Sequence, residues 1–161
     1  MKMEDLITPE QKLKLLVKDR PWENEPNEAE WVCETTGYHC RVRRHPNLLH
    51  LNGYVGIHKG HPCHGMSYED LNDLVDVHGG LTYSGKEADL MWFGFDTGHA
   101  GDLSPGVALH LLEIEPNRSW RFFEHEEYRD WEFVKGETED LALQLYRVGM
   151  ELWNGYTKTG D

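Results

Sequence analysis

The chain has 161 residues, of which 39% are hydrophobic and 11% aromatic, and this composition is typical of one folded domain rather than a disordered chain. Its net charge of −13 argues against binding nucleic acid through the phosphates, which requires a basic surface. No apolar run approaches the roughly 20 residues that cross a bilayer, and no secretory signal is visible, so we expect a cytoplasmic protein with no membrane partner.

The negative charge lies in the second part of the chain. Residues 1–64 carry nine acidic and nine basic side chains, whereas residues 65–161 carry twenty and seven. An acidic surface of this kind fits a basic partner protein, or serves only to keep the protein solvated. Cys33 and Cys40 flank a predicted hairpin turn. They form a cross-strand bridge in an oxidising compartment or, as we favour, remain free thiols in a reducing cytosol.

The first predicted element is a short helix. Thr8 and Gln11 have the spacing of a capping box, and the helix ends before the proline at position 21. Residues 21–28 are predicted to form an acidic linker. We therefore divide the chain into an N-terminal helix with its linker, residues 1–25, and a single globular domain, residues 26–161.

An antiparallel sheet is predicted next. Residues 30–34 and 39–44 alternate as a hairpin, and residues 49–57 follow as a third strand. Alternation places Arg41 and Arg43 on one face. With their neighbours they form the main basic cluster, which either holds a phosphate or carboxylate of a ligand or is paired with acidic side chains of the chain itself.

The loop over residues 58–66 carries three histidines and a cysteine, a set of metal-ligand types whose spacing matches no closed zinc pattern. A short helix follows to about residue 74, and a strand is predicted to begin at residues 75–78. Residues 107–114 fit either a strand or a short helix. Apolar residues at helical spacing predict a long helix over 128–153. This helix is either continuous or broken into two at Gly136.

Together these elements predict an α+β fold. We expect a single, mainly antiparallel sheet of five or six strands, covered on one face by the long C-terminal helix, with a short helix at the N-terminus.

The stretch over residues 76–102 holds the strongest candidate site. Asp76 and His78 are two residues apart and would share one face of a strand, so that Asp76 could orient the imidazole. Gly79 and the glycine after it allow a sharp turn or a close approach to a ligand. The hydroxyl groups of Thr82 and Tyr83 could then hold that ligand.

A second apolar strand, residues 91–95, leads into Asp96, His99 and Asp102. The set suits a divalent metal such as zinc bound by His78, Asp96 and His99, with an open position for water. Without metal, His78, Asp76 and Asp102 suit general acid–base catalysis. The alternative is that these residues are turn formers that only stabilise their own loops.

Several motifs resemble a family of small proteins common in phage and prophage genomes. The resemblance covers residues 26–150 and is carried mainly by residues 75–83 (Val-Asp-Val-His-Gly-Gly-Leu-Thr-Tyr) and 92–102 (Trp-Phe-Gly-Phe-Asp-Thr-Gly-His-Ala-Gly-Asp). The chain departs from that pattern at Thr97, where cysteine is frequent. The resemblance implies a phage-encoded protein that acts in the cytoplasm of a host cell.

Two main functions follow. The first is a metal-dependent hydrolase of a phosphoester or nucleotide, in which Arg41 or Arg43 holds the anionic group. The second is a non-catalytic anti-defence or host-takeover protein that binds a nucleotide signal, another small molecule or a basic host protein. In a third interpretation, residues 76–102 are structural and the chain acts through its surface.

Overall fold

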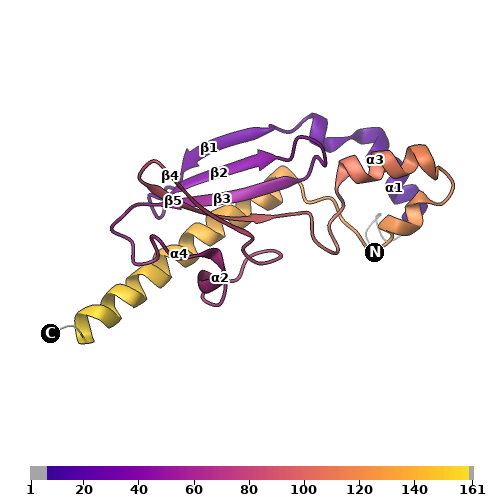
Figure 1. The fold of residues 1–161 in the computed structure, drawn as a ribbon. Helices are drawn as coiled ribbons and strands as arrows, with labels where there is room; N and C mark the ends of the chain where they lie inside the picture. The colour runs from indigo at the N-terminus through magenta and orange to yellow at the C-terminus, as the bar shows by residue number, and fades with distance from the viewer. Residues whose placement is uncertain (1–6, 160–161) are drawn as a thin grey trace.

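The computed structural model describes residues 7–159, with side chains through residue 154. Its centre is one antiparallel sheet of five strands in the order β1-β2-β3-β5-β4, which confirms the α+β prediction (Figure 1). The strands are β1 (Glu28–Val32), β2 (His39–Arg44), β3 (Leu51–Ile57), β4 (Tyr83–Glu87) and β5 (Leu90–Asp96). The helices are α1 (Pro9–Asp19), α2 (Tyr68–Leu71), α3 (Pro105–Ile114) and α4 (Trp131–Thr159), with short 3-10 turns η2 (Pro21–Glu23) and η3 (Ser119–Phe123).

The long helix α4 covers one face of the sheet, as predicted. Inward-facing strand residues such as Val55 and Phe93, which pair across β3 and β5, meet Leu141 and Leu145 of the helix, and all four are fully buried. The helix begins at residue 131 because the Asp130 carboxylate accepts a hydrogen bond from the third helical residue. The predicted start at residue 128 was therefore three residues early.

The helix is not divided at Gly136. No atom lies within 4 Å of the position that a Cβ would take there, so this glycine sits on an open side of a continuous helix. A single glycine costs a helix only about 1 kcal/mol, and the buried residues on either side of it, including Val134 and Leu141, hold the helix against the sheet.

Strand β4 was not predicted. It pairs with β5 in a hairpin whose turn contains Ala88 at φ 55°. Because β4 lies at the edge of the sheet, its residues are only partly buried or exposed. Its sequence therefore lacks the alternation of apolar residues by which a strand is predicted.

A second hydrophobic cluster lies beyond the end of the sheet. It contains Leu13, Leu103, Ala108 and Phe123, so α1, α3 and η3 form a small helical lobe (Figure 1). The predicted capping box of α1 is present, with both hydrogen bonds between Thr8 and its partner. Residues 105–114 form a helix, which resolves the alternative left open by their sequence.

The segment predicted as a linker is tied to the domain. Trp22 is 4% exposed and packs edge-to-face on Tyr128, with ring centroids 5.6 Å apart. The Glu25 carboxylate accepts hydrogen bonds from Arg44, from Tyr128 and from the backbone of Trp131. The segment between α1 and β1 therefore packs against the domain and is not a free linker.

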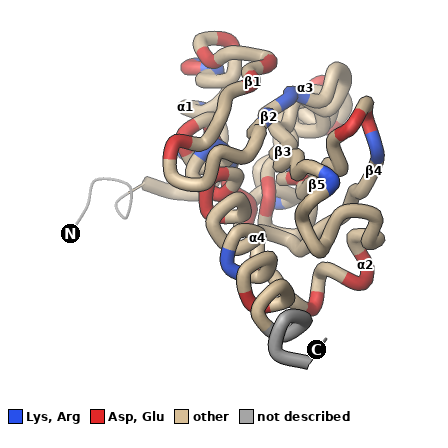
Figure 2. The backbone as a smooth tube through the Cα atoms, turned by 90° about the vertical axis from the view of Figure 1, so that its left-hand side faces the viewer, with Lys and Arg blue, Asp and Glu red and all other residues tan. Residues whose placement is uncertain are grey.

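Cys33 and Cys40 are buried free thiols, as favoured above. Burial is the main reason that the pKa of Cys40 is raised to about 12, so this thiol is un-ionised at neutral pH. Acidic side chains outnumber basic ones over the molecule (Figure 2). None of the helices in the described part of the chain is long and apolar enough to cross a bilayer.

Candidate functional site

The prediction of a strand at residues 75–78 was wrong. The segment is irregular, although Val75 and Val77 are buried in the main core. Gln144 of α4 holds this segment through two hydrogen bonds with the backbone of Asp76, at 2.7 and 2.6 Å. The Asp76 side chain is exposed, so the predicted alignment of Asp76 and His78 on one face of a strand does not exist.

The carboxylate that meets His78 is Asp102. Its two oxygens lie 2.8 and 2.9 Å from Nε2 of His78. The Asp102 side chain is fully buried, whereas the His78 side chain is 19% exposed. His78 and Asp102 were both predicted as site residues, and the structure brings them into contact although they are 24 positions apart in the sequence.

Two further residues complete this arrangement and were missed by the sequence reasoning. Nε of Arg129 donates a hydrogen bond of 2.9 Å to Asp102. The ring of Phe133 contacts His78 edge-on at 5.2 Å and also lies 5.2 Å below the Arg129 guanidinium. Arg129 belongs to no motif in the sequence. It lies near Asp102 because a backbone bridge pairs Asp102 with Glu127, two residues before Arg129.

The charge of Asp102 is stabilised by these neighbours. Burial acts to raise the pKa of the Asp102 carboxyl, but the hydrogen bonds from Arg129, His78 and the backbone of His99 outweigh it, and the net pKa lies below its ordinary value. Asp102 is therefore an ionised acceptor at neutral pH, and Nε2 of His78 must carry the proton that it donates.

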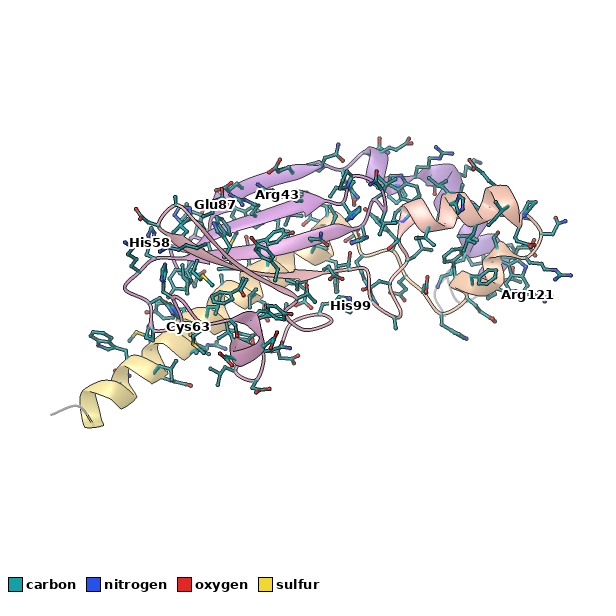
Figure 3. The ribbon with its side chains drawn as sticks, in the orientation of Figure 1. Arg43, His58, Cys63, Glu87, His99 and Arg121 are labelled. Atoms are coloured by element: carbon teal, nitrogen blue, oxygen red, sulfur yellow. The ribbon has the colours of Figure 1, made fainter. Side chains whose placement is uncertain are left out.

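A second histidine–aspartate contact joins Asp96, the last residue of β5, to His99 on the loop that follows; Figure 3 labels His99. Nδ1 of His99 is 2.8 Å from an oxygen of Asp96, but it is not aligned for a hydrogen bond, so the contact is electrostatic. Asp96 accepts hydrogen bonds from Thr82 at 3.2 Å and from the backbone of Gly98 at 2.9 Å. These bonds fix the carboxylate at the end of the sheet.

The two contacts are neighbours in space. A Cβ added to Gly79, the residue after His78, would lie 2.7 Å from Nδ1 of His99. Gly79 has φ +69°, a conformation that suits glycine, so both its backbone angle and its lack of a side chain allow His99 to pack there. We call His78, Asp102, His99, Asp96 and Arg129 the His–Asp cluster.

A third histidine borders the His–Asp cluster. His50 is 6% exposed, stacks on His45 at 5.2 Å and has Nδ1 3.3 Å from the hydroxyl of Ser104. Burial, with a smaller contribution from His45, lowers the pKa of His50. His50 is therefore a neutral, largely enclosed side chain beside the loop that carries His99.

The other predicted ligand-binding residues lie on the sheet face opposite α4. Tyr83 is 48% exposed and meets Tyr54 edge-on at 5.6 Å. The Arg41 guanidinium is paired with two carboxylates, those of Glu30 and Glu87, and lies 4.1 Å from the Trp92 ring.

Arg43 is also paired, with Glu28 at 2.8 Å. In the sheet it is separated from Asp96 by strand β3, because Asn52 pairs with both residues, and Figure 3 shows its place on β2. The alternative of internal pairing therefore describes both arginines.

Within the described residues, no group of three or more His, Cys, Asp and Glu side chains is arranged to hold a metal ion. In the loop over 58–66, His61 contacts the backbone oxygen of Leu145 at 2.7 Å, and His64 contacts that of Asp89 at 3.2 Å. These two histidines hold the loop to different neighbours and do not converge on one point.

No protein-family model, curated protein or solved structure matches this chain.

Proposed function

We propose that this chain is a small phage-type hydrolase of the host cytoplasm, which cleaves a phosphoester or nucleotide with His78 as general base. One observation supports it above all: the buried Asp102 carboxylate holds Nε2 of the partly exposed His78 at 2.8 and 2.9 Å. A carboxylate in this position fixes the tautomer of the imidazole and stabilises the imidazolium that forms. With the proton on Nε2, Nδ1 is the nitrogen that accepts a proton from water.

His99 is the proposed general acid. Its side chain is 37% exposed, and an oxygen of the Asp96 carboxylate lies 2.8 Å from its Nδ1. In the proposed reaction, His78 takes a proton from water, and the water oxygen attacks phosphorus. The bond to the leaving oxygen breaks, and His99 gives that oxygen a proton. Arg129, which is 24% exposed and also pairs with Glu127, holds the Asp102 carboxylate in place beside the proposed base.

The test measures hydrolysis by the purified chain of bis(p-nitrophenyl) phosphate and of a panel of linear and cyclic nucleotides, with chelator and with added zinc. His78→Gln should lower the rate by about 10²–10⁴-fold, the usual contribution of a general base. His110→Gln is the matched control, because His110 is exposed on α3. Equal rates for His78→Gln and the unmodified chain, or no turnover of any substrate, would contradict the proposal.

A second candidate is a protein that binds a nucleotide signal without cleaving it. The observation that favours it is the pair of Tyr83 and Tyr54, two aromatic rings on the sheet face opposite α4, of which Tyr83 is 48% exposed. Such rings can stack on a base. A ligand that is recovered unchanged after the protein is denatured, and whose binding is weakened by Tyr83→Ala, supports binding. Recovery of a cleaved product supports the hydrolase.

A further inference from the structure

The C-terminal half of α4 carries a second apolar stripe that the sheet does not cover. Tyr146, Met150 and Trp153 are 43%, 46% and 54% exposed, and Leu143 continues the stripe towards the N-terminus of the helix. The stripe that packs on the sheet is formed by other residues of the helix, among them Leu141, Leu145 and Val148. In Figure 1 this end of α4 runs out past the edge of the sheet.

The exposed stripe forms one wall of an apolar groove. The groove has a volume of about 390 Å³, and its other wall is formed by Tyr38, His58 and residues 60–62. The rings of Tyr38 and Tyr146 are 6.2 Å apart across it. The contact of His61 with the Leu145 backbone, at 2.7 Å, holds the second wall against the helix, so the groove is a built feature of the fold.

We propose that this surface binds a second copy of the chain, with the two α4 helices antiparallel. The four stripe residues are separated by three, four and three positions, a spacing that is the same when read in either direction. A two-fold axis near residue 148 therefore places Leu143 of each copy against Trp153 of the other, and Tyr146 against Met150. This is the reciprocal arrangement that a symmetric dimer interface requires.

The distribution of charge favours a second copy over a charged partner. Residues 65–140 contain eighteen acidic and five basic side chains and account for the whole net charge of −13. Residues 1–64 are balanced at nine each, and residues 141–161 at two each. Both walls of the groove come from these balanced segments. Two copies can therefore meet here without direct repulsion, whereas a basic partner would be drawn to the acidic segment.

The area is sufficient for a modest interface. Tyr146, Met150 and Trp153 are each about half exposed. At roughly 200 Å² for a large side chain, their exposed parts add up to about 290 Å² per copy and about 570 Å² for two. The groove residues bring the total towards the ~1,000 Å² of a specific interface. We therefore expect a dimer that dissociates on dilution.

Sedimentation velocity of the full chain, between about 1 and about 100 µM, tests this equilibrium. We expect the mass to rise with concentration towards twice the 18.8 kDa of one chain. Met150→Glu should return the protein to a monomer over this range, because a carboxylate would be buried against the ring of Tyr146. Ile114→Glu is the control, since Ile114 is 58% exposed on α3 and outside the groove.

A mixing experiment tests the antiparallel register. The Met150→Glu and Tyr146→Lys chains should each be monomeric alone, and together they should form a heterodimer. In that heterodimer one of the two contacts between positions 146 and 150 becomes a Lys–Glu pair, and the other remains the native pair of Tyr146 and Met150. Rescue also shows that both variants are folded. A wild-type monomer at every concentration, a dimer unaffected by Met150→Glu, or no rescue on mixing would each overturn the proposal, as would a monomer that associates only with an added basic peptide.

Discussion

Replacing Asp102 by Asn should destabilise the protein by about 2–4 kcal/mol at pH 7. The substitution keeps the shape of the side chain but removes a fully buried charge that accepts hydrogen bonds from Arg129, His78 and the backbone of His99. Each charge-assisted bond contributes about 1.5–3 kcal/mol. The expected destabilisation is smaller than the sum of these hydrogen bonds, because Arg129 and His78, whose side chains are 24% and 19% exposed, regain some contact with water in the variant.

The effect should depend on pH in a defined direction. The pKa of Asp102 in the folded protein lies below its ordinary value of 3.8, so the ionised form stabilises the fold above that pH. As the pH falls below 3.8 and through the lower folded pKa, this stabilisation is lost. The difference in stability between wild type and Asp102→Asn should therefore persist above about pH 4 and shrink below that.

Urea denaturation followed by tryptophan fluorescence measures both quantities, since the chain has six tryptophans. Asp76→Asn is the matched control: Asp76 is exposed, and its loss should change stability by no more than about 0.5 kcal/mol. If Asp102→Asn has an effect as small as this control, or if its effect grows as the pH falls below 3.8, the account of Asp102 as a buried, ionised acceptor is wrong.

Three glycine substitutions test the packing of α4, each by urea denaturation. Gly53→Ala should cost about 1–3 kcal/mol, because the added Cβ would clash with the Thr138 hydroxyl on α4. Gly149→Ala should also destabilise, since its Cβ would lie 2.6 Å from His61. Gly136→Ala on the same helix should instead stabilise by up to about 1 kcal/mol, because it meets nothing within 4 Å. A loss of stability for Gly136→Ala, or no loss for the other two, would refute these packing assignments.

Those parts of the fold that depend on local patterns could be predicted from the sequence. The capping box at Thr8 involves residues three positions apart, and the buried stripe of α4 repeats over several turns, so both are visible in a single stretch of chain. The segment over 75–78 shows the limit of such patterns. Val75 and Val77 alternate with polar residues and are buried, but an irregular loop packed on the core satisfies that alternation as well as a strand does.

The candidate site was predicted in part for the same reason. His78, Asp96, His99 and Asp102 lie close to glycine turns after apolar segments, and this local arrangement made them visible. Arg129 could not be foreseen, because it reaches Asp102 across 27 residues of sequence. The incorrect choice of Asp76 as the partner of His78 came from assigning a strand where Gln144 holds an irregular loop.

The contact between His78 and Asp102 joins the two hydrophobic clusters of the molecule. Val77, next to His78, belongs to the cluster under the sheet, and Leu103, next to Asp102, belongs to the cluster of the helical lobe. The same buried carboxylate therefore connects the lobe to the sheet and orients the proposed base. A change at Asp102 should affect stability and activity together, whereas a change at the partly exposed His78 should affect activity far more than stability, and this contrast separates a catalytic pair from a purely structural one.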